Sequence, residues 1–241
     1  SVLGGSGDVS ITNNGSGDVN INNVNNYGNG NVVIENINGG SAPTPGNVNL
    51  SGNVYASGEV SVSSDGSILQ TNNGALIDSQ GDVNLSAQNN IGSKEQTVVV
   101  SSGGNVVADA VTGGVNLTGD NTDIELGNIN AGTDYNIIVT GDKNIIFNKD
   151  LSNVNGDLSF ATDNDLNIES GITASGNVSL TSNNGDVILN ALVSSTGESV
   201  DLNAQGGIYQ GESFDAVSVN ANKDITLKAQ TGDIGSEGNS L

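Results

Sequence analysis

Short bursts of alternating apolar and polar residues follow one motif along the chain: glycine, then aspartate or asparagine, then apolar–any–apolar. Glycine accepts positive φ, and Asp or Asn can bond its own backbone two residues on, so the first half predicts a turn. The period-2 alternation predicts a short strand with one buried face. No stretch repeats its apolar residues every 3.6 positions, so we expect almost no helix. The clearest copies are residues 7–11, 17–21, 46–50, 81–85, 156–160, 176–180 and 185–189.

The spacing of these strands predicts the fold. Two interleaved series of apolar residues recur, and the first has a constant step of 21 residues. A hairpin sandwich has no reason to keep a fixed double period, whereas a solenoid does, because each unit is one coil. We therefore predict an all-β parallel β-helix with about 21 residues per coil and about ten to twelve coils. The first series is Ile124, Ile145, Leu166, Val187 and Ile208; the second is Tyr135, Leu158, Val178 and Val200, in steps of 23, 20 and 22.

The regularity differs along the chain. Residues 80–235 keep the register, whereas residues 1–80 predict less regular coils, because their valines are separated by 10, 13, 16 and 12 positions. Pro43 and Pro45 cannot continue a strand ladder, so a protruding loop is expected near 35–46. No composition shift marks a domain boundary, and we expect residues 1–241 to form a single β-helix segment of a longer protein. The valines are Val9, Val19, Val32, Val48 and Val60.

Composition removes several classes of function. The chain has no His and no Cys, which excludes a Ser-His-Asp triad, a thiolate nucleophile and zinc or iron–sulfur sites built on these ligands. It has 27 Asp+Glu against 5 Lys+Arg, a formal net charge of −22. Such a charge repels nucleic acid and anionic membranes. With no apolar run of about 18 residues, no membrane insertion is expected either.

The repeats resemble those of filamentous haemagglutinin-type exoproteins, the two-partner secretion family of Gram-negative bacteria. The resemblance rests on the Gly-Asp/Asn-Val-x-Leu units at about 21 residues and on the related phrases at 89–93 and 232–236, Asn-Asn-Ile-Gly-Ser and Gly-Asp-Ile-Gly-Ser. It implies a right-handed parallel β-helix, secreted through a dedicated outer-membrane pore. It also implies an extracellular location on the bacterial cell surface, with a role in adhesion, cell–cell contact or biofilm.

Carboxylates are the only catalytic candidates. Some β-helix enzymes cleave polysaccharides with clustered Asp residues as acid and base. The motif already requires Asp at the turns, however, so we interpret these residues as structural and predict no enzyme activity. A polysaccharide-active enzyme remains the alternative, and it would need three carboxylates together in a groove. The candidate pairs are Asp163 with Asp165, Asp120 with Asp123, and Asp142 with Asp150.

Calcium is the other candidate ligand. Residues 4–11 resemble one copy of the calcium-binding nonapeptide, and the next copy follows after 10 residues rather than 9. Asp8 and Asp18 are therefore the metal candidates, although the series does not continue and calcium needs six to eight oxygens. We expect no cofactor, with a calcium-stabilised module as a further alternative.

The sequence thus predicts a non-catalytic stalk or adhesive segment of a large secreted bacterial surface protein. Its partner would be a glycan or protein on another cell surface. Because the ends of a solenoid expose unpaired strand edges, end-to-end self-association is also expected.

Overall fold

The chain is almost entirely β-structure. The computed structural model describes residues 2–38, 45–211 and 219–235, and in these ranges the secondary structure is strands and one 3-10 turn, Leu126–Asn128. No helix in this part of the chain is long and apolar enough to cross a bilayer. The chain divides into two compact units, Ser1–Thr122 with Asn128–Gly132, and Asp123–Gly127 with Thr133–Leu241.

Each unit is a parallel β-solenoid, which confirms the predicted fold class. The chain makes about nine turns, and equivalent strands are about 23 residues apart. Both values differ slightly from the predicted 21 residues and ten to twelve coils. The reason is that the length of a coil varies, since turns between strands can gain residues without disturbing the ladder.

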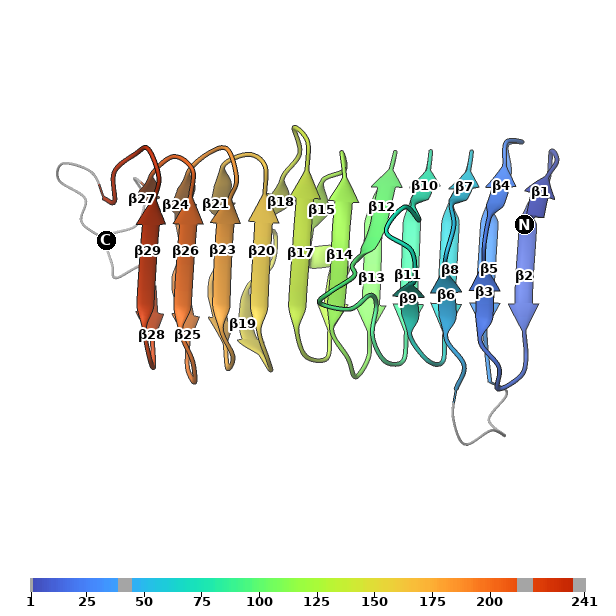
Figure 1. Cartoon of the computed structure of the whole chain (residues 1–241), viewed down its shortest axis with the longest axis horizontal. Coiled ribbons are helices and arrows are strands. Elements are labelled where there is room, and N and C mark those ends of the chain that lie inside the picture. Colours follow the sequence, from blue (N-terminus) through green and yellow to red (C-terminus); the bar gives the residue numbers. More distant parts are fainter. Residues whose placement is uncertain (1, 39–44, 212–218, 236–241) are drawn as a thin grey trace. The chain divides into compact units, whose positions relative to one another are not determined.

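Unit 1 is built from three parallel sheets (Figure 1). The first has the order β1 (Val2–Gly4), β4 (Val24–Asn26), β7 (Val54–Ala56), β10 (Ile77–Ser79), β12 (Val98–Ser102), β14 (Val115–Asp120). The second has the order β2 (Val9–Asn13), β5 (Val32–Asn36), β8 (Val60–Ser64), β11 (Val83–Ala87), β13 (Val106–Ala110), β16 (Ile129–Ala131). The third contains β3 (Val19–Ile21), β6 (Val48–Leu50) and β9 (Ile68–Gln70), and bridges through Ile91 and Val115 extend it.

Unit 2 follows the same plan. In Figure 1 its strands β20, β23, β26 and β29 lie side by side and point the same way. One sheet has the order β17 (Tyr135–Thr140), β20 (Leu158–Thr162), β23 (Val178–Ser182), β26 (Val200–Ala204), β29 (Ile225–Ala229). A second has β19 (Leu151–Val154), β22 (Ile172–Ala174), β25 (Val193–Ser195), β28 (Val219–Ala221). The remaining strands are the pair β15 (Ile124–Glu125) and β18 (Ile145–Ile146), and the group β21 (Leu166–Ile168), β24 (Val187–Leu189), β27 (Ile208–Gln210).

The strand register matches the predicted series in unit 2. Tyr135 pairs with Leu158, which pairs with Val178, which pairs with Val200. In the other series Ile124 pairs with Ile145, and Leu166, Val187 and Ile208 pair in turn. Spacing in the sequence therefore reports directly which residues stack.

The uneven valine spacing in residues 1–80 has a simple origin in the structure. Val9, Val32 and Val60 stack in one sheet, and Val19 stacks on Val48 in another. The five valines thus belong to two series, and one coil is longer, with Val32 and Val60 28 residues apart. The predicted loop near 35–46 falls in that coil. Its residues 39–44, with Pro43, lie outside the described residues.

The core consists of apolar ladders that run from coil to coil. Along each strand the side chains alternate between buried and partly exposed, as in Val60–Ser64 and Val178–Ser182. In unit 2, Phe160, Leu180 and Leu202 occupy equivalent inward positions and are at most 1% exposed. Each inward residue therefore packs against the coils on both sides as well as across its own coil.

Truncation of one rung should be costly. We expect Leu180→Ala to lower the free energy of unfolding by about 2–5 kcal/mol, because the cavity opens between two neighbouring rungs. The matched control is Leu192→Ala, where the side chain is 40% exposed. This control should cost less than about 1 kcal/mol. Urea unfolding followed by circular dichroism measures both, and equal losses would contradict the proposed core.

Candidate functional site

The acidic residues of the motif lie at the turns, where they join one coil to the next. In unit 1 the Oδ1 atom of Asp8 accepts a hydrogen bond from the backbone N–H of Asn31, at 2.7 Å. Asp18 accepts in the same way from Asn47 N–H, and Asp82 from Asn105 N–H, each also at 2.7 Å. The donor in each case is the equivalent turn of the following coil.

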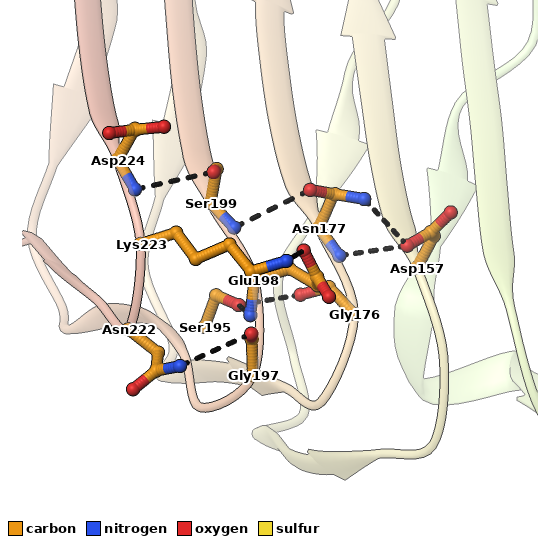
Figure 2. Close-up of polar contacts among 10 residues, drawn as sticks. All are labelled: Asp157, Gly176, Asn177, Ser195, Gly197, Glu198, Ser199, Asn222, Lys223 and Asp224. Carbon is orange, nitrogen blue, oxygen red and sulfur yellow. Dashed lines mark hydrogen bonds and ion pairs between the residues drawn. The ribbon is translucent and has the colours of Figure 1, made fainter.

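Unit 2 shows this arrangement as a continuous ladder (Figure 2). The carboxylate of Asp157 accepts from the backbone N–H of Asn177 at 2.8 Å and from its side-chain amide at 3.2 Å. The Asn177 side-chain oxygen accepts from Ser199 N–H at 3.4 Å, and Ser199 Oγ accepts from Asp224 N–H at 3.3 Å. Asp, Asn and Ser serve equally, because each supplies an acceptor oxygen on a short side chain. We call this row of side chains the turn ladder.

The turn ladder changes the interpretation of the motif's polar position. Sequence analysis assigned the Asp or Asn a bond to its own backbone two residues on. The bonds found instead reach the next coil, for example Asp165 to Asp186 N–H, 21 residues away, at 2.8 Å. The physical reason is that a turn N–H at this corner has no strand partner, and a buried or half-buried donor needs one.

The motif glycine also acts differently from the prediction. In the described residues only Gly92, Gly141, Gly156 and Gly235 have positive φ, and of these only Gly156 opens a copy of the motif. At Gly176 a Cβ would lie 2.4 Å from the Asp157 carboxylate and 2.5 Å from the Gly156 carbonyl oxygen. Glycine is required there because successive turns approach too closely for a side chain.

A second set of polar residues seals the turns from inside. The Ser79 hydroxyl is nearly buried, donates to the Gly58 carbonyl of the preceding coil at 2.7 Å, and accepts from Gly81 N–H at 3.2 Å. In unit 2 Ser195 donates to the Gly176 carbonyl at 2.6 Å and accepts from Glu198 N–H at 2.9 Å (Figure 2). These buried hydroxyls are satisfied as donor and acceptor, which allows a polar residue at the end of an apolar ladder.

The two calcium candidates are members of the turn ladder. Asp8 and Asp18 are exposed and lie just before β2 and β3, and each gives its Oδ1 to a backbone N–H. The second carboxylate oxygen of Asp18 also accepts from the Asn49 amide at 3.2 Å. Within the described ranges no three Asp or Glu side chains gather as a metal-binding group. The structure therefore does not bring Asp8 and Asp18 together around one position.

One of the three catalytic pairs shares a cavity. Asp163 and Asp165 line an open hollow of about 360 Å³ in unit 2, whose other lining residues are Asn144, Asn164, Asn167, Asn184 and Gly185. Asp163 accepts from Gly141 N–H at 3.0 Å and from the Asn183 amide at 3.2 Å. Neither an aromatic nor a basic residue is among those lining residues. The hollow therefore offers amides and bonded carboxylates, without the ring that would hold a sugar.

The other candidate carboxylates are also bonded to backbone. Asp123 accepts from Asn144 N–H at 2.8 Å and lies 3.6 Å from the Lys143 ammonium. Asp150 accepts from Gly171 N–H at 2.9 Å, while Asp142 is exposed. Asp120 closes β14 in unit 1.

Sequence analysis missed one feature of the surface. Tyr27 and Tyr55 form a ring pair in unit 1, with centroids 5.0 Å apart. The sequence contains a signal for it, since these residues are 28 positions apart, the same step that separates Val32 from Val60.

Comparison with known protein families, curated proteins and solved structures gives no match to this chain.

The turn ladder can be tested at Asp186, whose Oδ1 accepts from Gly207 N–H at 2.7 Å. We expect Asp186→Ala to lower the free energy of unfolding by about 1–2 kcal/mol, because the N–H loses its acceptor. Asp186→Asn keeps the carbonyl oxygen and should change it by less than about 0.5 kcal/mol. The measurement is urea unfolding of the three proteins. If Asn destabilised as much as Ala, charge rather than hydrogen bonding would be responsible.

Proposed function

We propose that the chain is a non-catalytic structural and adhesive segment of a large secreted bacterial surface protein. The observation that carries the proposal is the use made of the carboxylates. The acidic turn residues that are the only catalytic candidates accept backbone hydrogen bonds from the next coil, as at Asp165 and Asp186. A carboxylate held in this way serves the stack, and a catalytic acid or base needs a proton-transfer partner in the substrate instead.

Stacked coils suit a mechanical role. Every coil in a unit is joined to its neighbours by strand pairing, apolar ladders and the turn ladder. Such a stack resists bending and can present a repeated outer face to a partner. The net charge of −22 keeps copies apart and in solution.

The resemblance of the repeats to filamentous haemagglutinin-type exoproteins supports the same proposal. The Gly-Asp/Asn-Val-x-Leu units that carry it are the strands and turns of the solenoid described above. On this basis we place the chain outside the cell, exported through an outer-membrane pore, with a role in attachment or biofilm. Absence of cysteine suits export of an unfolded chain, because no disulfide can form before passage.

Adhesion is tested with beads that carry the purified chain. We expect such beads to attach to epithelial cells or to a bacterial lawn more than beads that carry serum albumin. Release of reducing sugar from a panel of polysaccharides is measured with the same preparation and should stay at the blank level. Attachment equal to albumin beads on both surfaces would contradict the adhesive role, and sugar release would favour the enzyme alternative.

Calcium dependence is tested separately by thermal melting. We expect the same melting temperature in EDTA and in millimolar calcium, because the Oδ1 atoms of Asp8 and Asp18 already accept backbone N–H groups. Magnesium at the same concentration controls for general screening of the negative charge. A rise of tens of degrees that only calcium produces would establish the calcium-stabilised module instead.

A further inference from the structure

Tyr27 and Tyr55 form an aromatic surface on the outer face of the first sheet of unit 1. Tyr55 lies at the centre of β7, between the buried residues Val54 and Ala56, so its side chain points outward. Tyr27 directly follows β4, the neighbouring strand, and is 66% exposed. The two ring planes are inclined by 35° and the centroids are 5.0 Å apart, so the rings form one nearly continuous face. We call this pair the tyrosine platform.

The other aromatic residues in the described ranges are used by the fold. Tyr135, Phe147 and Phe160 are at most 7% exposed. Tyr209 lies against its own chain, since a Cβ on Gly207 would be 2.2 Å from its ring. A ring that remains exposed contributes little to folding, whereas an exposed aromatic pair is typical of a binding surface. The tyrosine platform therefore calls for an explanation outside the core.

Polar side chains flank the platform on both sides. In the strand register, Asn25 and Asp78 occupy the positions next to Tyr55 on the preceding and following coils. Both are half-buried and face outward with it. Neither side chain makes a hydrogen bond to another residue in the described part of the chain, in contrast to the turn aspartates. They are thus available as an amide and a carboxylate at the edge of an aromatic face.

We propose that the tyrosine platform binds the sugar rings of a neutral, β-linked glycan. Such a sugar presents a flat face of C–H groups, which stacks on an aromatic ring, and a rim of hydroxyls, which Asn25 and Asp78 can bind by hydrogen bonds. This inference rests on the proposed adhesive function and gives that function a ligand.

Charge determines the choice of a neutral glycan. Lys94 is the single lysine in residues 1–122, which contain no arginine, and Asp78 is the direct neighbour of Tyr55. An anionic polysaccharide or a nucleic acid would therefore be repelled from this face. A neutral sugar incurs no such cost, and its hydroxyls can donate to the Asp78 carboxylate.

The experiment is affinity electrophoresis of the full chain in gels that contain soluble mixed-linkage β-glucan, with cellohexaose titrated by NMR for the Kd. Polygalacturonate serves as the anionic probe. We expect retardation by β-glucan and none by polygalacturonate. Tyr27→Ala and Tyr55→Ala should each weaken binding about tenfold, while Tyr55→Phe keeps the ring and should bind like the parent. Val111→Ala, at an exposed apolar residue (56%), controls for general loss of surface hydrophobicity.

Unchanged circular dichroism melts of the variants establish that each is folded. Absence of retardation by β-glucan and of cellohexaose binding would overturn the proposal, as would binding that both Tyr→Ala variants retain. If beads still attached to cells in those cases, the adhesive function would stand without this ligand. If attachment to cells required the tyrosines but β-glucan did not bind, the partner would be a protein and the glycan assignment would be wrong. If β-glucan binding required the tyrosines but beads did not attach, the platform would stand and the adhesive function would fail.

Discussion

The hydrogen bond from a turn N–H to the Asp or Asn side chain of the preceding coil is the interaction on which the rest of the structure depends. Strand pairing joins coils along the flat faces, but at each corner the ladder stops and leaves a backbone donor without a partner. The motif places one acceptor oxygen at that corner, as Asp157 does for Asn177 and Asp186 does for Gly207. An unsatisfied backbone donor costs about 1–3 kcal/mol where water is excluded, and the cost would recur in every coil.

The same interaction explains why so acidic a chain can fold. An aspartate in the turn ladder accepts a backbone N–H, so part of the acidic composition is structural. Neutral members also separate the charges, since Asn177 and Ser199 lie between Asp157 and Asp224 (Figure 2). Like charges further apart along a stack repel less, especially at physiological ionic strength. Asp165 and Asp186, in contrast, are direct neighbours, and there the hydrogen bond has to offset repulsion between carboxylates.

This division of work separates structure from recognition. Carboxylates at the turns are bonded to backbone and the inward rows are apolar, so chemistry for a partner is left to the outward positions of the sheets. Most of these carry Ser, Thr or Asn, for example Ser159, Ser179 and Asp201 in unit 2. Tyr27 and Tyr55 differ from this background by size and exposure, and Asn25 and Asp78 add unbonded polar groups beside them. A face of this kind suits attachment, whereas the hollow at Asp163 and Asp165 lacks a ring or a cation.

The sequence by itself determined the fold class, the strands and much of the register. A fixed step between apolar triplets has one physical source, the stacking of equal coils, and the pairs from Tyr135 to Val200 follow it. The sequence also marked the polar turn positions, but not their partners, because an Asp can bond its own turn or the next coil with equal local chemistry. Only the tertiary structure decided that the bond crosses to the next coil and that Gly176 is required by close approach. It alone also placed Tyr27 against Tyr55, because residues 28 positions apart meet only once the length of that coil is fixed by strand pairing.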